Sequence, residues 1–395
     1  MTTSGKVILK KGKEISIQRF HPWVFSGAIQ KLEGAVADGC WVEVADWKNE
    51  TLGFGHYQNG SIAVRMLSFD QDAPAPHFWE SRIAAALAVR NSADLPSADT
   101  NAFRIIHGEG DELPGLIVDY YAGTAVMQAH SIGMHADRQQ IAHALREVLG
   151  DRVTSIYYKS QSTLPGKMRE AYADEYLFGE RTQSGVISEN GNQFHVDWLE
   201  GQKTGFFLDQ RENRRLLGDF ARGKKVLNTF CYTGGFSIYA LKGGASLVHS
   251  VDASQRAIDM TEKNIALNAF DPVIHRCFAL DCFEFFKESK DEYDVMVLDP
   301  PAFAKHRDAR HQAVRGYQRL NAEAMRKIRS GGIIFTFSCS QVVDRQLFYD
   351  TIVSAAIQAR RQVSVLHHLS QPADHPVSMF HPEGEYLKGL VLYVR

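Results

Sequence analysis

Hydrophobic residues change their spacing along the chain near residue 190. Beyond that point, apolar runs of strand length alternate with segments of helical period almost to the C-terminus. This alternation favours a parallel sheet with crossover helices and predicts an α/β domain over residues 191–395. The expected strands cover residues 225–227, 247–251, 273–278, 294–298 and 333–337, and the clearest helices cover residues 254–268 and 312–329, the second ended by Gly331 and Gly332.

The preceding half of the chain has a different pattern. Residues 1–72 hold short alternating or apolar runs, such as 41–44 and 62–67, broken by glycines, which favours a small β-rich module. Two prolines within residues 72–76 resist both helix and sheet and predict a linker. Residues 73–190 read as an α+β domain, with expected elements over residues 78–90 (helix), 108–115 (loop), 116–121 and 124–129 (hairpin), 135–149 (helix) and 153–159 (strand).

The composition fits a folded protein without a membrane segment. Of the 395 residues, 44% are hydrophobic and 23% are charged, as in ordinary globular proteins. The N-terminus has no apolar run of signal-peptide length, and the chain has no run of 18 consecutive apolar residues. We therefore expect a cytoplasmic protein with no membrane association.

Neither the cysteines nor the net charge identifies a function. The five cysteines are an odd number, widely scattered, and no Cys-x-x-Cys or His-Glu-x-x-His spacing offers a metal site. We therefore expect reduced thiols and no metal. The net charge of −2 argues against wholesale electrostatic binding of nucleic acid, but basic residues gather locally between residues 304 and 330.

Polar residues follow the expected strands of the α/β domain. The first strand runs into residues 228–235, Asn-Thr-Phe-Cys-Tyr-Thr-Gly-Gly, a turn whose glycines let a ligand approach the backbone closely. Asp252 ends the next strand 17 residues after Gly235, near the spacing of about 20 at which an acid takes ribose hydroxyls. Asp281 and Asp299 follow the third and fourth strands. Because open α/β sheets bind ligands at this edge, a cofactor with a ribose is implied.

The cofactor is expected to lack a phosphate chain. The sequence has no Gly-x-x-x-x-Gly-Lys-[Ser/Thr] loop and no complete Gly-x-Gly-x-x-Gly fingerprint. ATP and nicotinamide dinucleotides are therefore disfavoured.

Two motifs are candidates for catalysis. In Asp299-Pro-Pro-Ala-Phe303, two prolines fix the backbone just after the fourth strand and hold the acid at the mouth of the site. Cys339 lies in Phe337-Ser-Cys-Ser340 at the end of the fifth strand, which should neighbour the strand that ends at Asp299. A thiolate there would be a nucleophile, although a buried inert thiol is the usual fate of a lone cysteine.

Together these residues resemble a class I methyltransferase, and more narrowly the bacterial 23S ribosomal RNA large-subunit methyltransferase I family, which makes 5-methylcytosine. The resemblance covers the whole chain. It implies a Rossmann-like sheet at the C-terminus, and S-adenosylmethionine as the cofactor, with S-adenosylhomocysteine as its product. Its most specific pieces are residues 201–214 (GQKTGFFLDQRENR), 228–235, 299–305 (DPPAFAK) and 337–340.

The resemblance also concerns the N-terminal module. Residues 19–26, Arg-Phe-His-Pro-Trp-Val-Phe-Ser, are similar to the start of a PUA domain, an RNA-binding β-barrel, although Phe20 departs from the more usual arginine-rich form. RNA contact by residues 1–72 is thus an implication of the resemblance. Trp23 and Phe25 fit the core of the module as well as a surface that stacks on bases.

Carried over from the family, the site residues have assigned roles. Asp252 would bind the ribose hydroxyls, Asp281 the adenine amino group, and Arg211 would close over the cofactor or the RNA. The methionine end of the cofactor would be lined by Asn228, Thr233, Gly234 and Gly235. The expected substrate contacts are Pro300, Phe303, Lys305 and Arg315.

The family's reaction implies a mechanism. Carbon 5 of cytosine is a poor nucleophile until a group adds to carbon 6, which Cys339 would supply, while Asp299 would meet ring nitrogen 3 and neutralise the adduct. Many RNA cytosine methyltransferases carry a second cysteine just after the motif's proline, where this chain has Ala302 and Phe303. Expulsion of the thiol must therefore be helped in another way.

Two other functions stay open. The same fold and cofactor could serve methylation of a base nitrogen, as in guanine, which needs no covalent adduct and would tolerate loss of Cys339. A non-catalytic RNA-binding assembly factor could keep the fold as a scaffold. The expected partner is 23S ribosomal RNA, naked or in an assembling large subunit, and the oligomeric state stays open, a homodimer included.

Overall fold

The computed structural model describes residues 3–179, 182, 184–304 and 307–395. The chain forms two compact units, which the backbone enters more than once. Unit 1 contains residues 1–185, 196–206 and 373–384, and unit 2 contains residues 186–195, 207–372 and 385–395. The division into three domains at residues 72 and 190 stays a prediction. Among the described helices, none is both long and apolar enough to cross a membrane.

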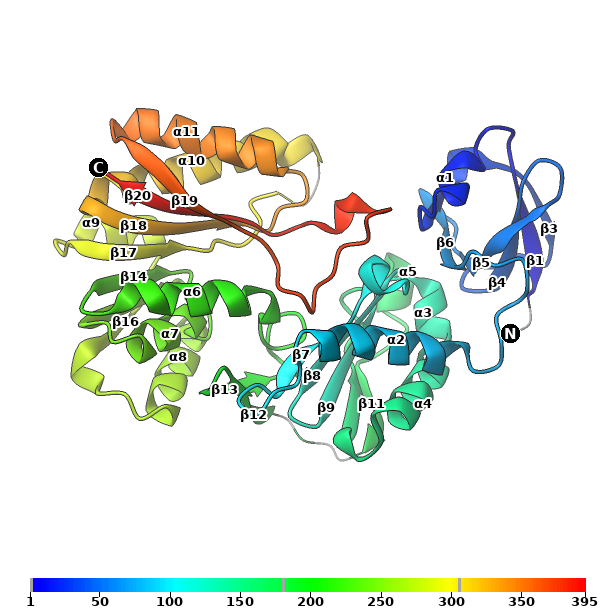
Figure 1. The fold of residues 1–395 in the computed structure, drawn as a ribbon, viewed down its shortest axis with the longest axis horizontal. Coiled ribbons are helices and arrows are strands. Elements are labelled where there is room, and N and C mark those ends of the chain that lie inside the picture. The colour runs from blue at the N-terminus through cyan, green and yellow to red at the C-terminus, as the bar shows by residue number, and fades with distance from the viewer. Residues whose placement is uncertain (1–2, 180–181, 183, 305–306) are drawn as a thin grey trace. The chain divides into compact units, whose positions relative to one another are not determined.

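Unit 1 begins with a curled six-stranded sheet, shown in blue in Figure 1. Its strands lie in the order β2-β6-β5-β4-β1-β3 around a core that includes Val7, Val44 and Val64. The predicted runs 41–44 and 62–67 are strands β4 and β6. The elements are β1 (Gly5–Leu9), α1 (Ile15–Gln18), β2 (Trp23–Phe25), β3 (Ile29–Gly34), β4 (Trp41–Ala45), β5 (Thr51–Tyr57) and β6 (Ile62–Ser68).

The second sheet of unit 1 has five strands in the order β11-β10-β9-β8-β7. The predicted hairpin is confirmed as β8 (Leu116–Tyr121) and β9 (Thr124–Ala129). The expected helix over 135–149 is divided at Asp137 into α3 (Ile132–Ala136) and α4 (Arg138–Leu149). The remaining elements are α2 (Phe78–Ser92), β7 (Ala102–His107), β10 (Ser155–Tyr158), α5 (Gly166–Arg169) and β11 (Glu175–Gly179).

Residues 373–384 join this unit through a buried ion network. Arg90 of α2 pairs with Asp111, and its guanidinium also donates to the backbone carbonyl of Asp374 at 2.7 Å. The Asp374 carboxylate accepts the backbone N–H of Arg104 at 3.0 Å. A segment that lies between two stretches of unit 2 in the sequence is therefore fixed to unit 1.

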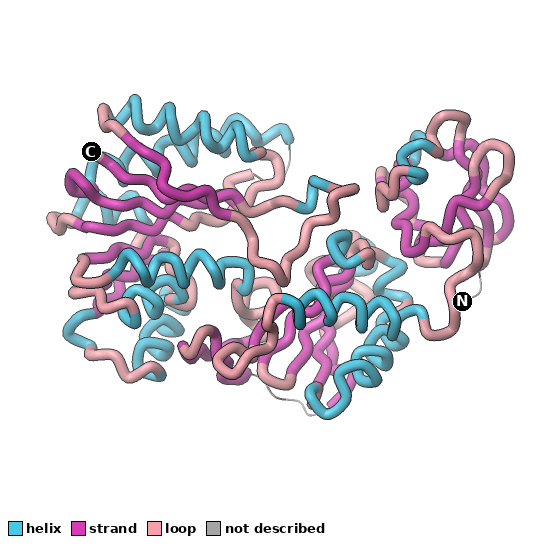
Figure 2. Tube along the Cα trace, in the orientation of Figure 1, coloured by secondary structure: helices cyan, strands magenta, loops and turns pink. Residues whose placement is uncertain are grey.

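Unit 2 is built on a seven-stranded sheet in the order β16-β15-β14-β17-β18-β20-β19. The first five strands are parallel, and β20 runs antiparallel to both of its neighbours. Figure 2 shows the alternation of helix and strand that the sequence predicted. The strands are β14 (Lys225–Thr229), β15 (Leu247–Asp252), β16 (His275–Ala279), β17 (Tyr293–Leu298), β18 (Ile328–Ser338), β19 (Val363–Leu369) and β20 (Lys388–Val394).

Six main helices cover the two faces of this sheet (Figure 1). One group comprises α6 (Arg211–Ala221), α7 (Gly235–Lys242) and α8 (Gln255–Leu267), and the other comprises α9 (Cys282–Glu288), α10 (Arg310–Lys327) and α11 (Arg345–Ala359). The second group shares one hydrophobic core with β17 and β18. A hairpin of β12 (Ser184–Glu189) and β13 (Asn192–Asp197) precedes α6.

The predicted end of α10 was wrong. The helix ends at Lys327, and β18 starts at Ile328, five residues before the expected strand. Gly331, at φ +81°, and Gly332 lie inside the strand, where a Cβ on Gly332 would come within 2.5 Å of the Ile328 side chain. The glycine pair therefore permits an irregular start of the strand, where the register with β17 shifts, and does not end the helix.

Candidate active site

The topology of unit 2 brings the predicted polar residues to one edge of its sheet. The parallel strands β14, β15, β16, β17 and β18 all end there, and the antiparallel β20 begins there. Asp252 closes β15, Asp299 follows β17 directly, and Cys339 follows β18. Since β17 and β18 are paired neighbours, the expectation that the strand before Cys339 lies beside the strand before Asp299 is confirmed.

The turn after β14 has an unusual backbone. Phe230 and Tyr232 adopt left-handed conformations, at φ 54° and 48°, which cost non-glycine residues free energy of order 1–3 kcal/mol each. Gly234 is also left-handed, and a Cβ there would lie 2.7 Å from the Thr261 side chain. Asn228 is buried at the end of β14 and donates to the Ser237 hydroxyl at 2.9 Å. Such strain is found where a loop is shaped for a ligand.

The first two acids of the edge are held by backbone groups. Asp252 accepts the N–H groups of Tyr232 at 3.0 Å and Ser254 at 2.9 Å, one on each carboxylate oxygen. Asp281 is the N-cap of α9, because its Oδ1 accepts the N–H groups of Phe283 and Glu284. Each carboxylate oxygen can accept two hydrogen bonds, so both acids keep capacity for donors of a ligand.

Asp299 is positioned by a chain of amides. The Gln210 side chain donates from Nε2 to Asp299 Oδ2 at 3.0 Å, and Asn213 donates to the Gln210 carbonyl oxygen at 2.6 Å. Asn213 is buried in α6, and Gln210 is buried just before that helix. This amide donor on one oxygen orients the carboxyl group of Asp299. Pro300, the next residue and an expected substrate contact, is buried.

Cys339 is half-buried, as is Cys277, whereas Cys231 and Cys282 are buried. Burial raises the pKa of the thiols of Cys277 and Cys282 to about 12 and that of Cys231 still further above the ordinary thiol range. Tyr317 of α10 interacts electrostatically with Cys339 and Asp299, and burial raises its pKa. Cys339 is therefore the accessible thiol beside the acid at this edge of unit 2.

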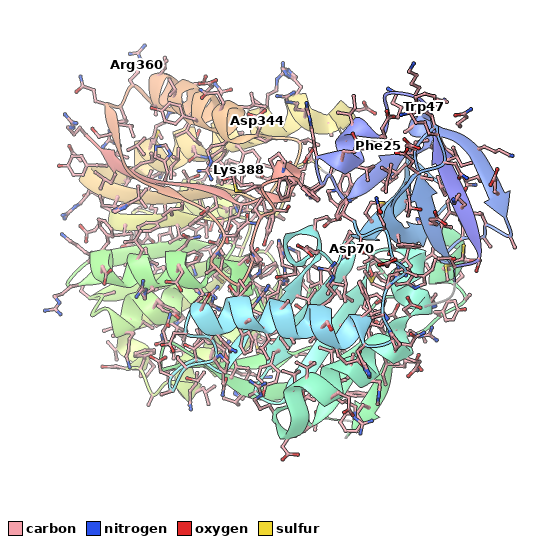
Figure 3. The ribbon with its side chains drawn as sticks, turned by 45° about the vertical axis from the view of Figure 1, so that its right-hand side comes forward. Phe25, Trp47, Asp70, Asp344, Arg360 and Lys388 are labelled. Carbon is pink, nitrogen blue, oxygen red and sulfur yellow. The ribbon has the colours of Figure 1, made fainter. Side chains whose placement is uncertain are left out.

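Lys388, the first residue of β20, also lies at this edge (Figure 3). It pairs with Ser338 in the antiparallel register, and only 3% of its surface is exposed. Its Nζ donates to the backbone carbonyls of Ser340 and Tyr386, both at 2.7 Å. A buried lysine is therefore held directly against the segment that carries Cys339.

The basic helix is less open to a polyanion than its composition suggests. Arg310 pairs with Asp344 at 3.5 Å, Arg326 pairs with Glu323 at 2.6 Å, and Arg319 lies 4.3 Å from the centre of the Phe283 ring. Arg315 is exposed. A hollow of about 410 Å³ opens beside the Cys339 segment, lined by Arg310, Gln341, Val342 and Asp344.

The other expected substrate contacts differ in position. Phe303 packs on Tyr317 with ring centres 4.7 Å apart, so it is fixed against α10. Lys305 lies outside the described residues. Arg211 is buried at the start of α6, and its Nε lies 3.4 Å from the carboxylate of the partly exposed Glu212.

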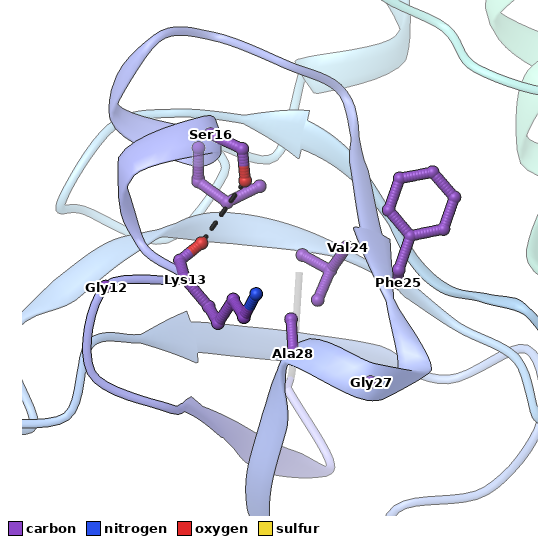
Figure 4. Close-up of a pocket in the computed structure, with 8 residues that line it drawn as sticks. Gly12, Lys13, Ser16, Val24, Phe25, Gly27 and Ala28 are labelled. Atoms are coloured by element: carbon purple, nitrogen blue, oxygen red, sulfur yellow. Dashed lines mark hydrogen bonds between the residues drawn. The ribbon is translucent and has the colours of Figure 1, made fainter.

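Of the two aromatic residues singled out in the N-terminal sheet, Trp23 packs against other side chains and Phe25 lies at the surface. Trp23 donates from its indole to Glu109 at 2.9 Å, and its ring lies 4.3 Å from that of His381. Phe25 is 47% exposed. It borders a hollow of about 470 Å³ that is also lined by Gly12, Lys13, Ser16, Ile17, Val24, Gly27 and Ala28 (Figure 4).

Sequence reasoning missed two groups of this site. Gln210 and Asn213 fall inside the motif 201–214, so the motif was noticed, but their role toward Asp299 depends on packing between distant segments. Lys388 gave only a weak signal, a single cation before the apolar run 389–394. In the described part of the chain, no group of three or more His, Cys, Asp and Glu side chains is arranged to hold a metal ion.

Comparison with known proteins agrees with this arrangement. A family model described as S-adenosylmethionine-dependent methyltransferase matches residues 103–378, and a PUA-like domain model matches residues 7–69. A crystal structure of a protein complexed with SAH aligns with TM-score 0.85 and 23% identity over 98% of this chain and 99% of that chain. A second solved structure, of a protein from Streptococcus mutans, aligns with TM-score 0.83 and 23% identity over the same shares of the two chains. These structures share the fold.

Curated relatives match over their full length. "Ribosomal RNA large subunit methyltransferase I" of Photobacterium profundum is 39% identical over 403 residues, covering 100% of both chains. The protein of the same name from Aeromonas hydrophila is 38% identical over 399 residues, covering 99% of this chain and 100% of that one. With the class I sheet and the acids and thiol at its edge, these matches show that the chain belongs to the ribosomal RNA large subunit methyltransferase I family of S-adenosylmethionine-dependent methyltransferases.

Proposed function

We propose that this protein transfers a methyl group from S-adenosylmethionine to carbon 5 of a cytosine in 23S ribosomal RNA, through a covalent bond between Cys339 and the base. The observation that carries the proposal is the placement of Asp299 and Cys339 after two paired parallel strands. The relatives' names support large-subunit ribosomal RNA as the substrate. The target atom and the covalent step go beyond those names.

The residues of the strand edge suit the cofactor. The Asp252 carboxylate is an acceptor for the ribose hydroxyls, and Asp281 is an acceptor for the adenine amino group, since both keep lone pairs beyond their backbone contacts. Asn228, with Thr233, Gly234 and Gly235 of the turn after β14, would face the methionine end. Arg211 is proposed to close this side of the site.

The chemistry follows from the target carbon. The Cys339 thiolate adds to carbon 6 of cytosine, which makes carbon 5 a nucleophile. Asp299, oriented by Gln210, shares a proton with ring nitrogen 3 and so neutralises the charge that develops on the ring. S-adenosylmethionine, when bound, supplies the methyl group. Transfer of the carbon-5 proton to a base then re-forms the double bond between carbons 5 and 6, and the bonding pair of the carbon–sulfur bond returns to Cys339.

RNA is proposed to contact both units. In unit 1, the exposed Phe25 and its hollow offer a stacking surface. In unit 2, Arg315 offers a cation, and the hollow beside the Cys339 segment offers room for a base. Pro300, Phe303 and Lys305 stay proposed substrate contacts. We propose that the protein acts in the cytoplasm, on naked RNA or on an assembling large subunit. Its oligomeric state stays open, a homodimer being one of the states that the sequence allows.

The test is a methylation assay with labelled S-adenosylmethionine and 23S ribosomal RNA that lacks the modification, followed by nucleoside analysis. We expect the label in 5-methylcytosine. Label in a methylated guanine would move the assignment to nitrogen methylation, and absence of label from both naked RNA and large-subunit precursors would favour a scaffold.

Cofactor binding gives a prediction that needs no RNA. Asp252→Asn should weaken S-adenosylmethionine binding about tenfold to a hundredfold, because it replaces a charged acceptor whose hydrogen bonds contribute about 1.5–3 kcal/mol. Isothermal titration calorimetry measures the change. Asp271→Asn, a change at a surface cap after α8, should leave the affinity as it is. An Asp252→Asn variant that binds like the wild type would remove the ribose role from this residue.

A further inference from the structure

Lys388 has no role in the mechanism so far, although it is a buried cation that contacts the Cys339 segment. Its strand partner Ser338 directly precedes Cys339, and its Nζ donates at 2.7 Å to the carbonyl of Ser340, which directly follows it. A second bond of 2.7 Å, to the carbonyl of Tyr386, fixes the side chain from its own strand. The ammonium group is thus held beside the backbone that presents the sulfur.

The charges around Lys388 come from several elements. Burial lowers the pKa of Lys388 to about 8, and Cys339, once it has lost its proton, has the largest effect in the opposite direction. Glu385 and Asp344 also favour the charged ammonium, and Arg345 opposes it. Glu385 and Arg345 are themselves an ion pair near the surface. Cys339 is therefore the strongest of these partners of the Lys388 charge.

We propose that the Lys388 ammonium group stabilises the negative charge of the Cys339 sulfur, so that the thiol is present as the attacking thiolate near neutral pH. The proposal adds a positioning residue to the covalent mechanism and rests on that proposed function. It concerns only the loss of the proton from sulfur to solvent, which leaves the electron pair on sulfur beside the ammonium. A stabilised thiolate is also a better leaving group. Lys388 thus also helps to expel the sulfur from the adduct.

Alkylation of the free enzyme tests this without RNA or cofactor. Iodoacetamide modification of Cys339 is followed by peptide mass spectrometry between pH 5.5 and 10, and the pH midpoint of the rate is determined. In the wild type we expect a midpoint clearly below the ordinary thiol value of about 8.5. A wild-type midpoint at or above that value overturns the proposal, whatever the variants do.

The variants separate charge from structure. Lys388→Met keeps the length of the stem and removes the charge, and should raise the midpoint by about one pH unit, which slows alkylation at pH 7 by up to about tenfold. Lys388→Arg keeps the charge and should restore most of the effect. Lys242→Met, at an exposed position in α7, should leave the midpoint unchanged. Thermal melting of each variant confirms that the fold is retained.

The outcomes distinguish this proposal from the function on which it rests. A structural role alone, in which Lys388 ties the carbonyls of Ser340 and Tyr386, would lower the melting temperature of Lys388→Met and leave its alkylation midpoint at the wild-type value. That result overturns the proposal. The identity of the methylated nucleoside is measured separately with the wild type, so nitrogen methylation would refute the covalent function even if the midpoint moves as expected.

Discussion

Cys339→Ala is expected to abolish formation of 5-methylcytosine, with a loss of roughly a thousandfold or more in turnover, about 4 kcal/mol of transition-state stabilisation. Without an addition at carbon 6, carbon 5 cannot attack the methyl group. Cofactor affinity should persist, because the thiol is not among the groups proposed to bind S-adenosylmethionine. The measurement is single-turnover methylation of unmodified 23S ribosomal RNA with nucleoside analysis.

The matched control is Cys277→Ala. Cys277 lies in β16 of the same sheet, and burial raises its pKa to about 12, so it should be a poor nucleophile and its loss should leave activity intact. Continued formation of 5-methylcytosine by the Cys339→Ala protein would assign the covalent step to another group. Continued methylation of a purine would instead remove the covalent step altogether.

Asp299→Asn is expected to lower turnover by about a hundredfold to ten-thousandfold while S-adenosylmethionine still binds. The amide cannot share a proton with ring nitrogen 3, and proton transfer by a positioned side chain contributes about that factor. The amide can still bond to Gln210, so the geometry of the loop should be kept. Rates measured against pH provide a second readout, since the wild-type profile should contain an ionisation that the variant lacks.

Asp291→Asn serves as the control for this acid. Asp291 precedes β17 at the opposite edge of the sheet, where its carboxylate lies 3.8 Å from His249. The same chemical change there should leave both turnover and the pH profile unaltered. If Asp299→Asn kept wild-type turnover on cytosine, neutralisation of the ring would have to come from another residue.

Local sequence determined much of the α/β unit. The C-terminal ends of β15, β17 and β18 were predicted to within about one residue, because apolar runs of strand length between helical segments have few alternatives. The sequence also predicted that the strand before Asp299 and the strand before Cys339 are neighbours in the sheet, and the pairing of β17 with β18 confirms this. The acids and the thiol could be singled out because the carboxyl ends of parallel strands meet at one edge.

Other boundaries of elements and units could not be predicted from local sequence patterns. Gly331 and Gly332 carry the signature of a helix end, yet they lie in β18, because their freedom of backbone angle serves an irregular strand equally well. Residues 373–384 fall inside the predicted α/β domain, but their Asp374 completes a buried ion network of unit 1. Neither outcome can be read from a window of neighbouring residues.

By itself, then, the sequence determined the class of the sheet and the chemical groups at its edge, since both depend on periodicity and on residues next to strand ends. Only the tertiary structure decided which other side chains contact the acid and the thiol segment at this edge. Gln210 reaches Asp299, and Lys388 reaches the Cys339 segment, through hydrogen bonds between residues far apart in the chain. Such contacts depend on how a returning antiparallel strand and a preceding helix pack against the sheet, which side-chain periodicity does not specify.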